Sequence, residues 1–93
     1  MDNYKIFETN GFLAGLQKDF SGQKGKIRNK LLNYIYPLLR KQPYYGHNIK
    51  KLVDYEPPTW RYRLGNYRLF YTINEKNKTI VMLTIDSRQS AYN

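Results

Sequence analysis

The chain has 93 residues, and its 16 Lys and Arg against 7 Asp and Glu leave a net charge of +9 with the single His neutral. This length fits one small domain, so we expect residues 1–93 to fold as a single unit. The sequence contains no cysteine, which excludes disulfides, thiolate nucleophiles and cysteine-ligated metal sites. No leader-like segment opens it, and no apolar run approaches the roughly 18 residues of a membrane span. We therefore expect a cytoplasmic protein with no membrane contact.

The first half of the sequence predicts a strand followed by two helices. Alternation over residues 4–9 favours a short strand, after which Thr9 or Asn10 can cap a short helix. Apolar residues at helical spacing predict a longer helix over residues 23–41. Pro37 lies inside this longer helix and removes one backbone donor, so we expect it to kink or end the helix.

The second half is rich in strand signals and turn residues. Residues 48–53 are a possible short strand, and residues 60–64, 67–74 and 79–86 favour three further strands. A two-residue turn, Gly65-Asn66, and a four-residue turn over residues 75–78 join the last three of them into an antiparallel meander. The order β-α-α-β-β-β predicts an α+β fold, with a helical hairpin packed on one face of a twisted antiparallel sheet.

The two-residue turn after Leu64 fixes which side chains face each other across the hairpin. In that register Arg63 lies opposite Arg68, and Arg61 lies opposite Phe70. Alternation places all four on the face away from the core. Because like charges directly opposite destabilise a sheet, and because arginine offers a rigid donor fork that matches phosphate, the cluster favours an anion site. Phe70 offers a surface on which a base can stack; the alternative is a set of solvated side chains that spread apart.

A second basic region lies upstream and has no acid to offset it. From residue 20 to residue 53 the sequence carries eight Lys and Arg and no Asp or Glu. A solvated helix face usually interleaves the two signs, so this run favours a polyanionic or acidic partner. We expect six of these residues to bind RNA diffusely and with strong salt dependence: Lys24, Lys26, Arg28, Lys30, Lys50 and Lys51.

Three sequence motifs carry a family resemblance that covers nearly the whole chain. Residues 60–71 read WRYRLGNYRLFY, the segment before them reads Pro43-x-x-Gly46-x-x-Ile49-Lys50-x-Leu52, and the carboxyl end reads Ile85-x-x-Arg88-x-x-x-Tyr92. At this spacing they resemble the motifs of RelE/ParE-superfamily toxins of bacterial toxin–antitoxin pairs. The resemblance implies a compact fold like that of microbial ribonucleases. It also implies an antitoxin, encoded alongside, whose acidic or amphipathic segment wraps the basic surface.

The resemblance is to RelE-type members in particular, which cleave messenger RNA in the ribosomal decoding site without metal or cofactor. In those toxins a ribose 2′-hydroxyl attacks the adjacent phosphate. Carried over by position, Arg68 would neutralise the phosphate charge in the transition state. Arg61 and Arg63 would stand where RelE has two catalytic lysines. Arg88 and Tyr92 would be the carboxyl-terminal arginine and tyrosine of the site.

Proton transfer has no settled residue in this scheme. Arg61 and Arg63 hold their protons too tightly for efficient acid–base work, and Ser87 stands where many relatives carry a histidine. Tyr92 is the first candidate, since nearby arginines would lower its pKa from about 10. His47, the single imidazole, falls in a loop. With one His, no Cys and no clustered carboxylates, we expect no metal site.

Two other functions stay open on the sequence. A ParE-like poison of DNA gyrase would share the fold and act by protein binding, and a non-catalytic basic module would bind RNA alone. The convergence of the hairpin arginines with Arg88 and Tyr92 favours the ribonuclease, because a gyrase binder has no evident need for converging phosphate ligands.

Overall fold

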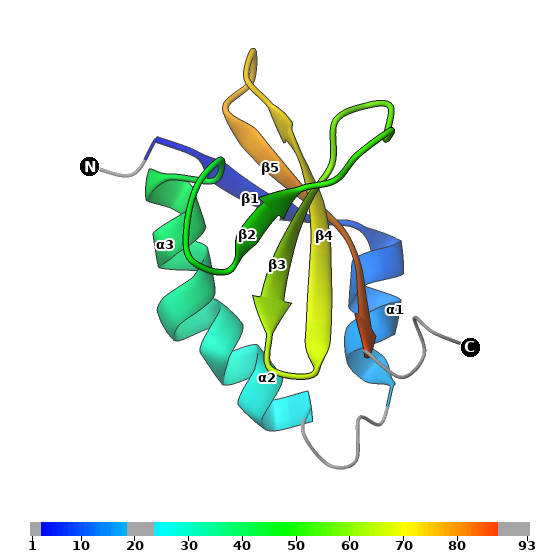
Figure 1. Cartoon of the computed structure of the whole chain (residues 1–93). Coiled ribbons are helices and arrows are strands. Elements are labelled where there is room, and N and C mark those ends of the chain that lie inside the picture. The colour runs from blue at the N-terminus through cyan, green and yellow to red at the C-terminus, as the bar shows by residue number, and fades with distance from the viewer. Residues whose placement is uncertain (1–2, 19–23, 88–93) are drawn as a thin grey trace.

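The computed structural model describes residues 3–18 and 24–87. Its elements, in chain order, are β1 (Lys5–Glu8), α1 (Asn10–Gln17), α2 (Lys24–Lys30), η1 (Leu31–Ile35), α3 (Tyr36–Lys41), β2 (Ile49–Lys51), β3 (Trp60–Leu64), β4 (Tyr67–Asn74) and β5 (Thr79–Ser87). The five strands form one sheet in the order β1-β5-β4-β3-β2, shown in Figure 1. The predicted α+β fold is therefore confirmed, with β2 as a fourth strand after the helices where the predicted order has three, and the turns at residues 65–66 and 75–78 lie where the sequence places them.

The direction of β1 is the one departure from an antiparallel sheet. β2, β3, β4 and β5 pair in antiparallel fashion, whereas β1 runs parallel to β5, with Lys5 opposite Thr79 and Glu8 opposite Met82. No hairpin links β1 to β5, since the helices and the whole meander lie between them in the chain. The direction of β1 is therefore free of the constraint that tight turns impose on the strands joined by hairpins.

The long helix does not end at Pro37, as the sequence analysis allowed, but continues to Lys41. The segment η1 just before it is wound as a π-helix, and the Tyr36 N–H donates to the Leu31 carbonyl five residues back. Pro37 then lies in the first turn of α3. Widening the helix by one residue ahead of the proline avoids the hydrogen bond that its ring nitrogen cannot donate.

Helix α1 covers the part of β5 that β1 leaves free. The Thr9 hydroxyl accepts from the Phe12 N–H at 3.1 Å, which caps the helix as predicted, and donates to the Met82 carbonyl at 2.8 Å. The absence of a side chain at Gly15 lets the helix approach β5 closely, since a Cβ there would lie 2.8 Å from Ile85 Cγ2. This contact fixes the position of β5, the strand that completes the site described below.

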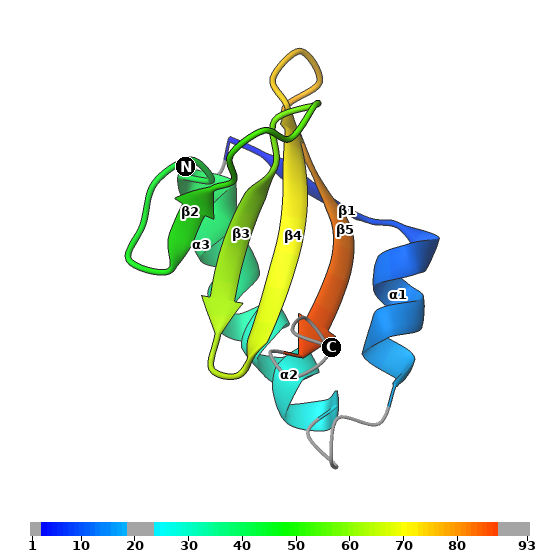
Figure 2. The same ribbon diagram turned by 45° about the vertical axis from the view of Figure 1, so that its right-hand side comes forward.

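The core lies between the helices and one face of the sheet. Figure 2 shows α2 and α3 behind the sheet and α1 beside β5. The buried apolar residues are Phe12, Leu16, Ile27, Leu31, Ile35, Tyr36, Leu39, Trp60, Tyr62, Leu69, Tyr71, Ile80, Met82 and Ile85. Alternate residues of the hairpin therefore point inward, as its register predicts. The other face of β3 and β4 is left without a helix in the described part of the chain.

Candidate nucleic-acid interface

The β3–β4 hairpin has the register that its two-residue turn predicts. Gly65 adopts a φ of 58°, which the first central position of a type II′ turn requires. Arg63 therefore pairs with Arg68, and Arg61 pairs with Phe70. None of the four belongs to the core, and all alternate with buried residues of their strands. The structure thus brings these four predicted residues together on the open face of the sheet.

Strand β2 adds a fourth cation to the open face. Lys50 pairs with Arg61 across the β2–β3 register, so its side chain lies on the same side. Lys50 therefore lies directly opposite Arg61, and Arg63 lies directly opposite Arg68. Each of these two pairs joins like charges on neighbouring strands. Opposite charges in these places would contribute roughly 0.2–1 kcal/mol each, whereas like charges are destabilising. We call the surface formed by Lys50, Arg61, Arg63 and Arg68 the cationic face.

Strand β5 brings a carboxylate to the cationic face through a β-bulge. Tyr71 pairs with Met82 but the next residue, Phe70, pairs with Thr84, so Leu83 is skipped. Arg68 consequently lies opposite Asp86. Without the bulge Asp86 would fall opposite Tyr67, on the core side. Asp86 is not among the residues predicted from the sequence, although the sequence carries a signal for it, because an unshifted register would turn a charged side chain toward the core, where it is costly.

Two arginines of the cationic face each have one nitrogen without an acceptor. The Nε atoms of Arg61 and Arg68 are shielded from solvent and have no hydrogen-bond partner. No ion pair joins Arg68 to Asp86, although the two residues lie opposite each other. Instead the Arg68 Cζ lies 5.5 Å from the centroid of the Phe70 ring, a cation–π contact. A shielded donor left unpaired costs about 1–3 kcal/mol, so these groups favour the arrival of an anionic acceptor.

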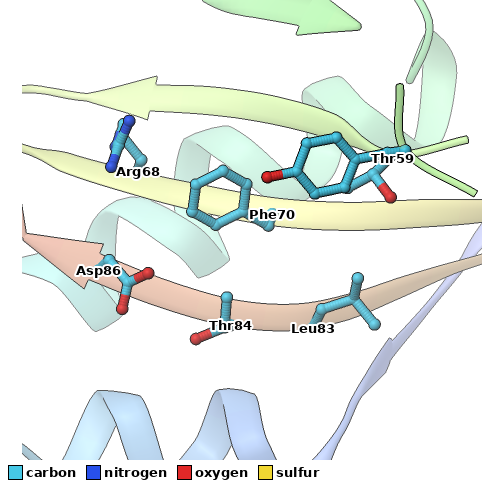
Figure 3. A pocket seen from close by; sticks show the side chains of 7 residues that line it. Thr59, Arg68, Phe70, Leu83, Thr84 and Asp86 are labelled. Atoms are coloured by element: carbon cyan, nitrogen blue, oxygen red, sulfur yellow. The ribbon is translucent and has the colours of Figure 1, made fainter. Parts of the chain in front are cut away.

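A hollow of about 380 Å³ lies next to these arginines, over β4 and β5. Its lining consists of Tyr55, Thr59, Arg68, Phe70, Leu83, Thr84 and Asp86. Figure 3 shows Arg68 beside Asp86 at one end, Phe70 beside Thr84 in the middle, and Thr59 and Leu83 at the other end. Of these residues, Arg68 and Phe70 are predicted from the sequence. The other five come from the bulge in β5 and from the loop between β2 and β3, which carry no motif of their own.

The predicted RNA-binding residues of the long helix lie apart from the cationic face. Lys26 and Lys30 are exposed on α2, which covers the opposite face of the sheet, and the side chain of Lys24 lies outside the described residues. Arg28 is paired: its Nη1 lies 2.7 Å from Glu8 Oε2. The run itself contains no acid, as the sequence shows, but β1 supplies a carboxylate to Arg28 from outside the run.

The Glu8–Arg28 pair is completed by a tyrosine. The Tyr36 hydroxyl donates to Glu8 Oε2 at 2.6 Å. Partial burial works to raise the pKa of Glu8, but hydrogen bonds from Arg28 and Tyr36 outweigh it and lower that pKa below its ordinary value of 4.5. Burial and the bond to Glu8 raise the pKa of the Tyr36 hydroxyl. This cluster joins β1 to the long helix, so we assign it a structural role.

The remaining predicted residues divide between the β2 edge and the carboxyl end. Lys51 points to the core side of β2, where its Nζ lies 5.6 Å from the centroid of the Trp60 ring. Arg88 and Tyr92 lie outside the described residues, so their place in the site stays a prediction. Among residues 3–18 and 24–87, no group of three or more His, Asp or Glu side chains could hold a metal ion.

Comparison with known proteins identifies the family. A family model described as ParE toxin of type II toxin–antitoxin system, parDE, matches residues 13–92. The chain belongs to this family. It is therefore a toxin of the RelE/ParE superfamily, as the three sequence motifs indicate. None of the curated proteins matches the chain closely enough to count as a relative.

Solved structures of RelE toxins share the fold. The toxin–antitoxin complex RelBE2 from Mycobacterium tuberculosis gives a TM-score of 0.72 at 24% identity, over 92% of this chain and 99% of that one. The archaeal RelE–RelB complex from Pyrococcus horikoshii OT3 gives 0.68 at 22% identity, over 92% and 96%. A mutant of E. coli RelE in the free state gives 0.67 at 18% identity, over 99% and 90%. These similarities confirm the RelE-like fold predicted from the sequence.

The described part of the toxin has no helix that is both long enough and apolar enough to cross a membrane.

Proposed function

We propose that the toxin is an endoribonuclease that cleaves messenger RNA on the ribosome and so inhibits translation. The observation that carries this proposal is the cationic face, on which two pairs of like charges lie opposite each other. A surface that served stability alone would be better built with opposite charges at these positions. A bound polyanion removes the repulsion, since each phosphate neutralises the cations that contact it.

The arginines would act on the phosphate rather than on protons. When the 2′-hydroxyl oxygen attacks the neighbouring phosphorus it loses its proton, the bond from phosphorus to the 5′-oxygen of the next nucleotide breaks, and that oxygen takes up a proton. Negative charge grows on the phosphoryl oxygens in the transition state. Arg68 and Arg61, whose Nε–H groups have no acceptor, can donate to those oxygens, and Arg63 adds a third positive charge beside them. An arginine stays protonated throughout, so proton transfer needs another group. Arg88 and Tyr92 complete the site in this proposal, with Tyr92 as the proton-transfer residue.

We also propose that a cognate antitoxin neutralises the toxin. The similar structures from M. tuberculosis and P. horikoshii are complexes of a RelE-type toxin with its antitoxin. The exposed cations of α2, Lys26 and Lys30, together with Lys51 at the β2 edge, would attract either the acidic segment of an antitoxin or ribosomal RNA. These three cations are not part of the cationic face, so this second proposal accounts for charge that the phosphate-binding proposal does not use.

The test is to induce the toxin in growing cells and to map the 5′ ends of messenger RNA. Cuts at fixed positions within codons, confined to translated regions, are the expected result. Cuts that are independent of translation would contradict the part of the proposal that concerns the ribosome. Intact transcripts would contradict the ribonuclease proposal as a whole.

Poisoning of DNA gyrase is the second candidate function. The matching family model is that of ParE toxins, and no described residue of the site has an assigned role in proton transfer. In this case induction would leave transcripts intact and trap gyrase on broken DNA. Extraction of DNA and RNA from the same induced culture therefore distinguishes the two functions.

A further inference from the structure

The hollow beside Arg68 has the size and lining of a site for one flat ligand. Its volume of about 380 Å³ is within the range of roughly 300–1,000 Å³ that is typical of small-ligand pockets. Two aromatic side chains, Tyr55 and Phe70, line it together with the apolar Leu83. In Figure 3, where the helices lie behind the sheet, the Phe70 ring presents its face toward the open side. A nucleobase can stack on such a ring, as bases do on aromatic residues of other open sheets.

The polar groups of the hollow lie along one side of the Phe70 ring. Thr84 pairs with Phe70 across β4 and β5, and Asp86 follows two residues later on the same face of β5. A base stacked on Phe70 would therefore present one edge to β5. Arg68 precedes Phe70 by two residues on β4 and lines the same hollow. It is placed to contact the phosphate of the nucleotide that carries this base.

The carboxylate decides which base fits this edge. An ionised carboxylate only accepts hydrogen bonds and offers two oxygens side by side. Guanine presents two adjacent donors on its Watson–Crick edge, N1–H and the N2 amino group. Adenine and cytosine present one amino group next to a ring nitrogen that is itself an acceptor, and uracil presents a single N–H between two carbonyls. A carboxylate therefore pairs with guanine through two bonds and meets a repulsive acceptor on each of the other bases.

We propose that this hollow is a guanine-binding subsite, in which the base stacks on Phe70 and donates its N1–H and N2–H groups to Asp86. The inference rests on the proposed ribonuclease function for its biological meaning, since it makes guanosine the nucleotide held next to the phosphate at Arg68. The bulge at Leu83 is what makes the subsite possible, because it turns Asp86 toward the open face.

The test measures binding of nucleotides to the purified full chain, without any requirement for catalysis. Guanosine 3′-monophosphate and adenosine 3′-monophosphate are titrated separately and followed by amide chemical shifts. We expect guanosine 3′-monophosphate to bind about tenfold more tightly, the size of effect that a bidentate contact to a base gives. Equal affinity for the two nucleotides would overturn the proposal.

Three variants assign the preference to the proposed contacts. Asp86→Asn replaces one acceptor by a donor and should abolish the preference for guanosine. Asp54→Asn makes the same change of charge outside the lining, and Asn tolerates the positive φ of 63° at that position, so the preference should stay. Phe70→Leu keeps an apolar side chain but removes the ring, and should weaken the binding of both nucleotides to the same extent. A guanosine preference that survives in Asp86→Asn would overturn the proposal.

The outcomes also separate the subsite from the ribonuclease proposal. A chain that prefers guanosine 3′-monophosphate but leaves transcripts intact in cells keeps the subsite and loses the proposed function. A chain that cleaves messenger RNA but binds the two nucleotides equally keeps the function and loses the subsite.

Discussion

Arg28 and Arg68 belong to opposite sides of the same sheet and have different surroundings. Arg28 reaches Glu8 at 2.7 Å, and the same carboxylate accepts from the Tyr36 hydroxyl. Arg68 lies between Arg63 on β3 and Asp86 on β5, without an ion pair to Asp86 and with its Nε unpaired. The charge of Arg28 on the helix side is neutralised, while the charge on the open side is concentrated against its own repulsion.

The contrast shows which positive charges of a basic protein contribute to stability and which are available to bind a ligand. The net charge of +9 describes both regions alike and cannot separate them. The hydrogen-bond partners separate them, because a satisfied ion pair stabilises the free protein and an unsatisfied cluster destabilises it until a ligand arrives. The substitutions below test this difference, in order of the expected effect.

Arg68→Ala is expected to have the largest effect on activity. Loss of one preorganised donor to the phosphoryl oxygens should lower the cleavage rate by about 10²–10³-fold and abolish growth inhibition. Antitoxin binding should stay largely intact. Growth after induction and pull-down with the antitoxin measure the two properties. Lys76→Ala, which removes an exposed cation from the turn between β4 and β5, should remain toxic. If Arg68→Ala is fully toxic, the ribonuclease proposal is wrong.

Arg28→Ala should act on stability instead. It leaves Glu8 with only one of its two side-chain donors, so we expect the free energy of unfolding to fall by about 1–3 kcal/mol. Urea unfolding followed by circular dichroism measures the change. Lys26→Ala, on the same helix but without an ion pair, should change it by no more than about 0.5 kcal/mol. Equal effects of the two substitutions would remove the distinction between paired and unpaired cations.

The contribution of Glu8 should also depend on pH. Its pKa is lowered in the folded chain relative to the ordinary value of 4.5, so the folded state favours the ionised form. The stabilisation is therefore fully present above pH 4.5 and is lost as the pH falls through the lower pKa of the folded state. The stability difference between the wild type and Glu8→Gln should narrow between pH 7 and pH 3, as unfolding in urea can show. A stability difference that widens as the pH falls would contradict the role given to the Glu8 carboxylate.

Arg63→Thr should have the smallest effect and the opposite sign. It removes a charge opposite Arg68 and introduces a residue that strands favour, so the free energy of unfolding should rise by roughly 0.2–1 kcal/mol. The same urea measurement applies, with toxicity assayed in parallel and expected to weaken. A loss of stability would mean that Arg63 makes a favourable contact and that the cationic face is not strained by its charges.

Local features of the fold could be predicted where short-range chemistry determines them. The Gly65-Asn66 turn fixes every pair of the β3–β4 hairpin, so the positions of Arg61, Arg63 and Arg68 follow from the sequence. The Thr9 cap follows in the same way, from a hydroxyl three residues before an N–H that needs an acceptor. The site is thus most predictable where it lies next to a tight turn.

Features that depend on distant segments could not be predicted. The parallel pairing of β1 with β5 and the ion pair between Glu8 and Arg28 both arise from packing between residues far apart in the chain. At Pro37 the sequence shows the missing donor but not the wider turn that avoids the need for it. The place of Asp86 in the site was not predicted, because the face on which its side chain lies depends on the one residue of β5, Leu83, that has no partner in the ladder.

The skipped residue in β5 makes the open face depend on the register of the strand. If Leu83 paired with Phe70 in an unbroken ladder, every later residue of β5 would turn to the opposite face, and Ile85 rather than Asp86 would lie opposite Arg68. Such a shift in register would exchange a carboxylate for an aliphatic group at the middle of the surface while leaving the residue types of both strands unaltered. The chemistry offered by this face is therefore encoded in spacing as much as in identity.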